Sequence, residues 1–343
     1  MFSSLLKKLL YVLGPLVIYH RVRNAHTLTV VMFHRVLASD DARWQGADPD
    51  YTLRADLFES CLVFFKQHYN IVNIDAVLAA RTSGCRLPAR ALLITFDDGW
   101  ADNVDHALPR LQALKLPALM FVVADAINRL EPFYQERIFG AWRRQRLSVE
   151  RLAQALRAHG APSALARERS DEAGLRGLIA QVEALPESQR DALLDSLAPE
   201  LSESNGARQH MVSAEQIRQL AADGVAIGAH GKTHTPLTRA ADLDAELSGA
   251  RHTLAQHLPG MAPPTSLSFP HGRFDARVAE QVSKAGYELA FSSTPALNPV
   301  RPMLGSLLGR LGVSAEAVSD TRGRFSPERL ALHLFRQPHR AFA

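Results

Sequence analysis

The sequence predicts an α/β protein built on a parallel sheet that helices cover on both faces. Short apolar, β-branched runs alternate with longer segments whose apolar residues recur at a spacing of three and four. The runs are apolar almost throughout, which is typical of parallel strands buried on both sides. A barrel and a doubly wound sheet both satisfy this pattern. The 343 residues, 47% hydrophobic and 22% charged, suffice for one large core or two modest ones.

Six runs are predicted strands, because each is rich in branched aliphatic or aromatic residues and is bounded by turn residues. These runs are residues 27–33, 91–96, 118–123, 225–229, 266–269 and 289–291. Helices are predicted over residues 53–69 and 102–117, where the apolar spacing follows the helical period. The last segment, 316–343, contains LALHLF and is predicted to form an amphipathic helix and a tail.

Residues 127–210 carry no strand pattern and are helical in periodicity throughout. We interpret them as a helical insertion between two parts of the sheet domain, 27–126 and 211–315. Four arginines in the first part of the insertion are expected to form a solvated face, although contact with an acidic or phosphorylated substrate stays an alternative. These arginines are Arg137, Arg143, Arg144 and Arg146.

Composition limits the classes of partner. The net charge is +4, and no run of Lys and Arg is dense or interleaved with aromatic residues, so nucleic acid is not an expected partner. An anionic membrane surface fits the mild positive charge equally well. Cys61 and Cys85 are the two cysteines, which cannot form a disulfide framework and are compatible with a reducing compartment.

The first 26 residues combine an apolar run with flanking cations. The uninterrupted apolar stretch, residues 9–19, is too short to span a bilayer, and no small-x-small cleavage site follows it. Lys7 and Lys8 precede it, and Arg21 and Arg23 follow. We expect a segment in peripheral contact with the cytoplasmic face of the inner membrane, broken at Gly14-Pro15. An ordinary packed helix and an export signal, which would place the protein in the periplasm or outside, remain alternatives.

Polar groups that can carry chemistry follow four of the predicted strands. His34 ends the first, Asp97-Asp98-Gly99 the second, His230 the fourth and Pro270-His271-Gly272 the fifth. In a parallel barrel the carboxyl ends of the strands open on one face. We therefore expect these groups to converge there.

Two adjacent carboxylates at the end of a buried strand need a compensating positive charge or water. His230 and His234 lie four residues apart and share a face if that segment forms a helical turn. With 14 histidines in the chain, about half such a pair is expected by chance, so the spacing alone is weak. One Asp and two His at neighbouring strand ends would bind Zn²⁺ or a similar divalent ion. The alternative is a solvated helix cap beside surface histidines.

Three motifs in order give the chain a resemblance to a known family. TFDDG at 95–99, HxxxH at 230–234 and FPHG at 269–272 resemble the first three motifs of NodB-type polysaccharide deacetylases. The similarity covers about residues 27–126 and 211–315. It implies a distorted, incomplete (β/α) barrel in which one divalent metal assists removal of acetyl groups from sugars. Zn²⁺ is the expected ion, with Co, Ni, Mn or Fe as alternatives.

The resemblance also implies roles for individual residues. The first acid of TFDDG, Asp97, corresponds to the catalytic base of the family. The metal ligands correspond to Asp98, His230 and His234. In the third motif, a backbone N–H near the oxyanion falls on His271. Its neighbours Pro270 and Gly272 are expected at the same substrate-facing turn.

The chain departs from the family pattern at three places. Gly231 stands where Ser or Thr is common, and we expect it to loosen the loop while sparing the ligands. Ser268 replaces the arginine that orients the base, and Arg310 in GRLGV is the candidate substitute. The usual C-terminal Leu-x-His, source of the general acid, is missing. His34 in MFHRV resembles a permuted arrangement and becomes the candidate acid, with a structural or substrate-binding histidine as the alternative.

These features together predict a metal-dependent hydrolase. Its expected substrate is an N-acetylated (or otherwise N-acylated) amino sugar of a polysaccharide or of a lipid-linked glycan precursor. Asp97 would take the proton of the attacking water, and His34 would protonate the departing amine. The alternatives are an O-acetyl esterase, a peptidoglycan deacetylase and an inactive carbohydrate-binding module. A two-aspartate phosphatase would need Asp-x-Asp, whereas the two acids here are adjacent.

Overall fold

The computed structural model describes residues 4–161, 170–202 and 209–342. The chain divides into two compact units. The first comprises Met1–Ala38, Asp50–Arg129 and His210–Ala343, and the second comprises Ser39–Pro49 and Leu130–Gln209. The second unit contains all of the expected helical insertion, 127–210, except its first three residues and its last one. It also takes in Ser39–Pro49, which the predicted boundaries left in the barrel.

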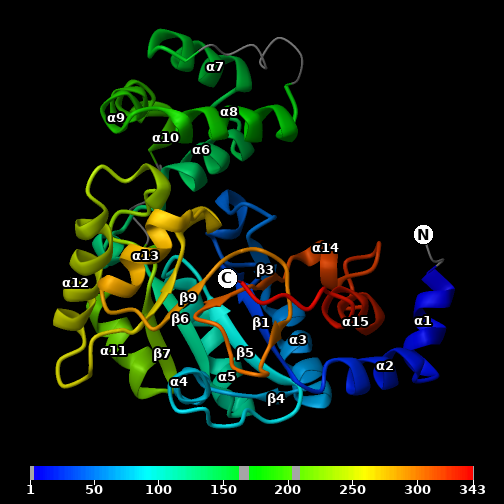
Figure 1. Cartoon of the computed structure of the whole chain (residues 1–343). Helices are drawn as coiled ribbons and strands as arrows, with labels where there is room; N and C mark the ends of the chain where they lie inside the picture. The colour runs from blue at the N-terminus through cyan, green and yellow to red at the C-terminus, as the bar shows by residue number, and fades with distance from the viewer. Residues whose placement is uncertain (1–3, 162–169, 203–208, 343) are drawn as a thin grey trace. The chain divides into compact units, whose positions relative to one another are not determined.

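The first unit is built on a nearly closed parallel sheet, so the predicted α/β fold with a distorted barrel is confirmed (Figure 1). All six predicted runs form strands, with ends that differ by at most one residue from the predicted ones. The strands are β1 (Thr27–Phe33), β2 (Arg35–Leu37), β3 (Thr52–Arg54), β4 (Asn70–Ile71), β5 (Ala91–Phe96), β6 (Ala118–Val122), β7 (Val225–Ala229), β8 (Ser266–Ser268), β9 (Leu289–Phe291), β10 (Asn298–Pro299), β11 (Leu307–Leu308) and β12 (Leu311–Gly312).

The main sheet runs in the order β10-β1-β5-β6-β7-β8-β9-β11. Its neighbours are parallel, except that β10 is antiparallel to β1. The strand β4 adds to β5, and β2 with β3 forms a separate two-stranded sheet. The sequence did not predict β2, β3, β4, β10, β11 and β12, since segments of two or three residues are too short to show a period of two.

The barrel is closed by a crossing of the chain between β11 and β12. The strand β11 pairs with β9 at one edge of the sheet, and β12 pairs with β1 at the other. Only Gly309 and Arg310 separate these two strands. The buried side chain of Asn298 links the edges: its Nδ2 donates to the carbonyls of Leu28 (3.2 Å) and Gly309 (2.9 Å), and its Oδ1 accepts from Gly309 N (2.8 Å).

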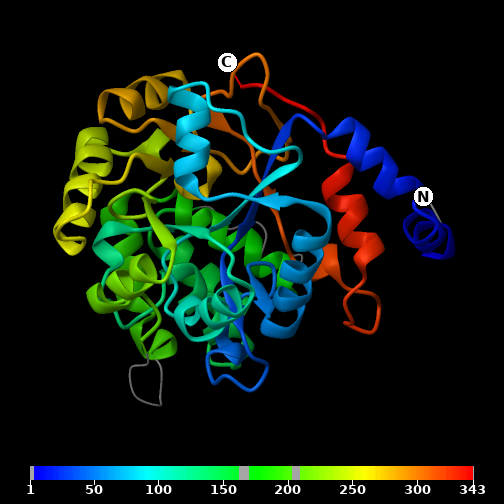
Figure 2. The ribbon, with the colours of Figure 1, turned by 90° about the horizontal axis from the view of Figure 1, so that it is seen from below.

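The helices of the first unit lie around this sheet, except that α1 and α2 pack on α15 at its margin (Figure 2). They are α1 (Ser4–Val12), α2 (Pro15–Arg23), α3 (Ala55–His68), α4 (Ile74–Thr82), α5 (Leu108–Leu114), α11 (Ala214–Ala222), α12 (Ala250–His257), α13 (Ala276–Lys284), α14 (Ala315–Val318) and α15 (Pro327–Phe335). Alternate residues of β1, β5, β6 and β9 enter two different cores. In β5, Leu92 and Ile94 belong to one core, whereas Ala91 and Leu93 belong to the other, together with Phe121. This two-sided burial explains why the strands are apolar throughout.

The second unit is helical in its described part. Its helices are α6 (Tyr134–Arg143), α7 (Val149–Ala158), α8 (Glu172–Ala184), α9 (Glu187–Ser196) and α10 (Ala198–Leu201), around a core of their own. Of the four arginines expected to form a solvated face, Arg143 is exposed, and Arg137, Arg144 and Arg146 are half-buried. Arg143 also donates to the carbonyl of Ala47 (2.8 Å) and Arg146 to that of Pro199 in α10 (2.6 Å), so these two side chains link separate segments of this unit.

The first two helices are separated at Gly14-Pro15, as predicted. Gly14 adopts φ 95°, which glycine tolerates, and Pro15 begins α2, where its missing N–H has no partner to lose. Both helices pack against α15, and the ring of His20 stacks on Phe335 at 3.9 Å. Among the described residues, no helix is both long and apolar enough to cross a bilayer.

Replacing Asn298 should weaken the closure of the barrel. We expect Asn298→Ala to lower the free energy of unfolding by about 2–4 kcal/mol, because it strands the buried polar groups of Leu28 and Gly309. The exposed Asn70, whose Nδ2 donates to Ala89 O, is the matched control, and Asn70→Ala should cost at most about 1 kcal/mol. Urea unfolding of both variants measures the difference. Equal losses would show that the Asn298 bonds do not hold the barrel closed.

Candidate metal and active site

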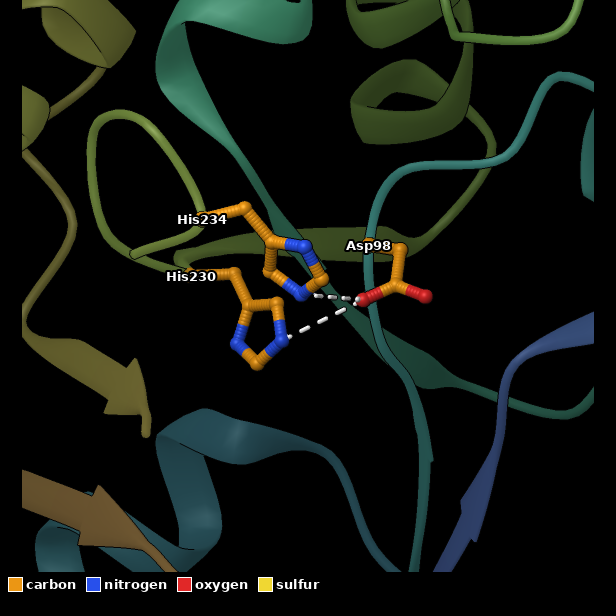
Figure 3. A group of neighbouring side chains, drawn as sticks. All are labelled: Asp98, His230 and His234. Atoms are coloured by element: carbon orange, nitrogen blue, oxygen red, sulfur yellow. Dashed lines mark ion pairs between the residues drawn. The ribbon is translucent and has the colours of Figure 1, made fainter. Parts of the chain in front are cut away.

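Three predicted ligands converge at the carboxyl ends of β5 and β7. The Nε2 atoms of His230 and His234 each lie 3.3 Å from Oδ1 of Asp98. One donor atom from each of the three residues falls within 4.8 Å of the others. Figure 3 shows both imidazole rings directed at the same carboxylate oxygen. Asp98 and His230 are buried, and His234 is partly buried.

The donor set fits a divalent metal ion. Ligand bonds of about 2.0–2.1 Å place two corners of a tetrahedron about 3.3 Å apart, which agrees with the two spacings around Asp98. Nδ1 of His230 donates to the carbonyl of Ser268 at 2.9 Å, which leaves its Nε2 lone pair for an ion. Burial alone would lower the pKa of His230, but the charges of Asp97 and Asp98 raise it above the ordinary value. The same negative potential would attract a cation.

Trp100 holds the other oxygen of Asp98, and sequence reasoning missed it. Its Nε1 donates to Asp98 Oδ2 at 2.9 Å, so Oδ1 is the oxygen that faces the histidines. The guanidinium of Arg35 lies 4.3 Å from the Trp100 ring centroid and pairs with buried Asp102 at 2.7 Å. The indole is therefore fixed by a stacked cation, which is itself neutralised. The only sequence signal was the position of Trp100, directly after TFDDG.

Backbone strain concentrates around the ligands. Among the described residues other than glycine, seven have positive φ, and three of these are Asp98 (76°), His234 (70°) and His271 (57°). Such conformations cost energy and recur where a structure holds side chains for function. The stretch from His230 to His234 is a loop, so the helical turn considered for HxxxH is wrong. The left-handed turn at His234 helps to bring the second ring back to Asp98.

Gly231 does not loosen this loop. Its φ is 72°, and a Cβ there would lie 3.0 Å from Pro270 and 3.1 Å from Oε2 of Glu246. The buried Glu246 accepts hydrogen bonds from Lys232 N (2.7 Å) and Thr233 N (3.1 Å). The absent side chain therefore lets a carboxylate fasten the loop that carries both histidines. The expectation of a looser loop was wrong, since Glu246 comes from a segment that the motif does not include.

Arg310 lies against Asp97. Its Nη1 donates to Oδ1 (2.6 Å) and its Nη2 to Oδ2 (2.7 Å), and both side chains are almost fully buried. Nη2 also donates to Ser268 Oγ (2.7 Å), and Nε donates to Ser292 O (3.1 Å). The short side chain of Ser268 leaves room for a guanidinium that arrives from the barrel closure. Arg310 thus occupies the position expected of the arginine missing from the third motif.

The ion pair with Arg310 keeps Asp97 ionised. Burial alone would raise the pKa of the carboxyl group, but Arg310 and His230 outweigh it and hold the pKa below the ordinary value. The pKa of Asp98 lies well below its ordinary value, because hydrogen bonds to His230 and His234 outweigh the effect of burial. Both adjacent acids are therefore ionised near neutral pH. Arg310 stabilises the charge of Asp97, and the two histidines stabilise that of Asp98.

His34 lies at the end of β1, partly buried, with its ring 5.0 Å from that of Tyr51. Its backbone carbonyl accepts from Asn103 Nδ2 at 2.7 Å. Burial lowers its pKa below the ordinary value, although Asp98 and Asp97 act in the opposite direction. The ring is thus electrostatically coupled to both acids. Its role as general acid stays a prediction.

The turn Pro270–Gly272 supports His234. The ring of His271 stacks on His234 at 4.7 Å, and its Nε2 donates to His234 O at 3.2 Å. Burial lowers the pKa of His271 to about 3, so this ring stays neutral. A Cβ on Gly272 would lie 1.8 Å from Ser293 Oγ, which restricts that position to glycine. The sequence assigned only a backbone N–H to His271, and that assignment remains a prediction.

The histidine of LALHLF belongs to α15, as the predicted helix required. His333 donates from Nε2 to Gly312 O at 2.8 Å. The buried face of this helix is Leu330, Ala331, Leu334 and Phe335. His333 is therefore engaged in packing α15 on the end of β12.

With this geometry established, comparison with known proteins identifies the class. The polysaccharide deacetylase family model matches residues 85–165 and 197–290, just over half of the chain. The chain belongs to this family of carbohydrate deacetylases, and the predicted resemblance is confirmed. The match includes Asp97, Asp98, His230 and His234, whereas His34 and Arg310 lie outside it. A comparison with curated proteins finds no match.

Solved structures share the fold over most of their length. Deacetylase PplD of Streptococcus pyogenes, in complex with acetate, is 14% identical, with a TM-score of 0.57 over 90% of this chain and 98% of that one. IcaB of Ammonifex degensii is 18% identical, with a TM-score of 0.57 over 91% and 98%. A de-N-acetylase of Aggregatibacter actinomycetemcomitans is 16% identical, with a TM-score of 0.52 over 83% and 94%. At these identities the likeness concerns the fold.

Removing the indole N–H of Trp100 should weaken metal binding. We expect Trp100→Phe to lower the affinity for Zn²⁺ by about 10- to 100-fold, the usual effect of losing a group that orients a ligand. Titration of the metal-free protein against a competing chelator measures it. Trp142→Phe in the second unit is the matched control and should bind Zn²⁺ like the wild type. An unchanged affinity in Trp100→Phe would show that the indole does not orient Asp98.

Proposed function

We propose that this chain is a metal-dependent deacetylase that hydrolyses the N-acetyl, or another N-acyl, group of an amino sugar. Its substrate would belong to a polysaccharide or to a lipid-linked glycan precursor. One observation carries the proposal: Asp97, paired with Arg310, adjoins the ligand cluster of Asp98, His230 and His234. A base fixed beside a metal site is the arrangement that assisted hydrolysis needs.

Asp98, His230 and His234 would hold the ion. When bound, a divalent metal supplies Lewis acidity toward the acyl oxygen and toward water. Zn²⁺ suits one carboxylate and two imidazoles and leaves open coordination positions. Co, Ni, Mn or Fe would also accept these donors.

Asp97 would accept the proton of the attacking water. Arg310 keeps this carboxylate ionised and fixes its plane through two parallel hydrogen bonds. In the described structure Oδ1 accepts from Arg310, and a carboxylate oxygen has room for a further bond. The second lone pair of Oδ1 is the candidate proton acceptor.

His34 would deliver a proton to the departing amine. Burial lowers the pKa of this ring below the ordinary value, and the acid role requires the protonated ring. Catalysis through protonated His34 is therefore lost as the pH rises through its pKa. The backbone N–H of His271 would stabilise the oxyanion.

Related activities share this arrangement. An O-acetyl esterase and a peptidoglycan deacetylase would use the same base and ligands, whereas a sugar-binding module would need neither. The intact ligand set and the ionised Asp97 support an enzyme. One of the proteins with a similar fold is a de-N-acetylase, which makes N-acetylhexosamines the first substrates to test.

Metal content and acetate release test the proposal together. Purified protein should carry about one divalent ion and release acetate from at least one member of a panel of free, polymeric and lipid-linked N-acetylhexosamines. Asp98→Asn should lose both the ion and the activity. Asp97→Asn should keep the ion and lose most turnover, because Asp97 is not among the three ligands.

Three outcomes would contradict these roles. Full activity of the metal-free wild type would remove the metal from the mechanism. Equal loss of ion in Asp97→Asn and Asp98→Asn would show that the base and the ligand are wrongly assigned. An ion bound without release of acetate from any N- or O-acetylated sugar would favour the binding module.

Loss of His34 should affect turnover and leave the metal in place. We expect His34→Ala to lower kcat by about 10²- to 10⁴-fold, the usual range for a lost acid or base. The alkaline limb of kcat/KM should disappear, because the variant no longer has the group whose deprotonation stops catalysis. The exposed His252, replaced by Ala, is the control and should keep the wild-type profile. An alkaline limb retained in His34→Ala would exclude it as the acid.

A further inference from the structure

The first two helices carry most of the exposed large apolar side chains. Of thirteen such residues in the described part of the chain, eight lie between positions 5 and 22. They are Leu5, Leu6, Leu9, Val12, Leu13, Ile18, Tyr19 and Val22. The exposed fraction reaches 73% at Leu13 and 75% at Val22. Contiguous apolar exposure of this kind marks an interaction surface.

The amphipathic pattern of α1 is reversed relative to an ordinary surface helix. Leu10 and Tyr11 face the body of the first unit and pack on its core. The opposite stripe, with spacing four and three, is Leu5, Leu9 and Val12, all exposed. The helix is thus apolar on the side that faces away from the protein.

The same reversal recurs in α2. Leu16 and His20 are buried four residues apart, whereas Ile18, Tyr19 and Val22 are exposed on the other side. We call the exposed apolar residues of α1, Leu13 and α2, named above, the outer apolar face.

The two helices are held firmly, so this face is a fixed feature of the first unit. Tyr11 Oη lies 2.9 Å from Nε2 of His68, and Arg23 donates to Gln337 O at 2.9 Å. Figure 2 shows both helices beside α15 at the margin of the first unit. The bonds anchor the inner side and leave the outer side for a partner.

The charged residues among the outer apolar face indicate which kind of partner would bind there. No acidic residue occurs before Asp40, while Lys8 and Arg21 are exposed among the apolar side chains. Apolar side chains with interspersed cations match the interface of an anionic bilayer, where apolar burial and attraction to lipid headgroups add. A face of mixed charges, as at most protein contacts, would have included acids.

We propose that the outer apolar face docks this chain on the surface of an anionic phospholipid bilayer. Each helix has nine residues, a length of about 14 Å against a hydrocarbon core of about 30 Å, so the helices lie in the interface and do not span it. This goes beyond the proposed hydrolysis and does not depend on it. The expected cytoplasmic location remains a prediction beside it.

Vesicle flotation of the full chain tests the proposal. The protein should float with vesicles of phosphatidylcholine containing about 30% phosphatidylglycerol, and much less with phosphatidylcholine alone. Rising salt should weaken flotation, because it screens the headgroup charge.

Two pairs of substitutions separate the two contributions. Leu9→Gln with Val22→Gln should lower the vesicle partition coefficient at least about tenfold, through lost apolar burial. Lys8→Gln with Arg21→Gln should lower it about 25-fold on the anionic vesicles, at about fivefold per cation, and little on neutral ones. All four positions are exposed, so the thermal melts should match the wild type.

Matched substitutions elsewhere control for hydrophobicity and charge. Met261→Gln with Met303→Gln removes two exposed apolar side chains, and Arg86→Gln removes an exposed cation. Both controls should float like the wild type.

Three results would overturn the proposal. The first is a wild type that stays in solution beside anionic vesicles at low salt. The second is flotation that the Leu9 and Val22 pair leaves unchanged. The third is self-association without vesicles that this pair abolishes in sedimentation velocity while flotation persists, which would make a second copy of the chain the partner.

Discussion

The buried pair of adjacent carboxylates at the end of β5 is the constraint on which the rest of the site depends. Two like charges there are stable only if each has its own compensation. The two carboxylates have different partners: Asp97 forms an ion pair with Arg310, and Asp98 lies beside the imidazoles of His230 and His234. The left-handed backbone at Asp98 is part of this separation. The strained backbone at Asp98 thus allows two neighbouring carboxylates to lie in different electrostatic environments.

The same short segment of the chain closes the barrel and supplies the positive charge that pairs with Asp97. Arg310 lies in the two-residue crossing between β11 and β12, and its guanidinium enters the barrel between Ser268 and Asp97. An arginine placed on β8 would serve the same carboxylate without this crossing. Here the pairing also fastens the last strands to β5. Loss of Arg310 would therefore leave the buried charge of Asp97 unpaired and would also weaken the closure of the barrel. A measurement of activity alone would not separate these two effects.

Much of this arrangement could be predicted from the sequence. The main strands followed from their apolar runs, and the convergence of Asp98, His230 and His234 followed from their places at strand ends. Arg310 was a candidate only because an expected arginine was missing, since no local pattern joins residues 213 positions apart. Trp100 and Glu246 escaped prediction. Their roles rest on hydrogen bonds between one carboxylate oxygen and one donor, which no sequence pattern shows. Gly231 was misjudged because Glu246, which fastens its loop, lies outside the motif.

The support around the ligands explains why the loop from His230 to His234 can be short and strained. Glu246 fixes its backbone, and Ser268 fixes one ring through a carbonyl group. His271 stacks on the other ring and remains neutral, so it adds no charge to compete with an ion. Each support comes from a different element, and none supplies a ligand. The three candidate ligands are thus held in place by the folded chain itself, so the free-energy cost of ordering them is met during folding and would not weaken the binding of an ion.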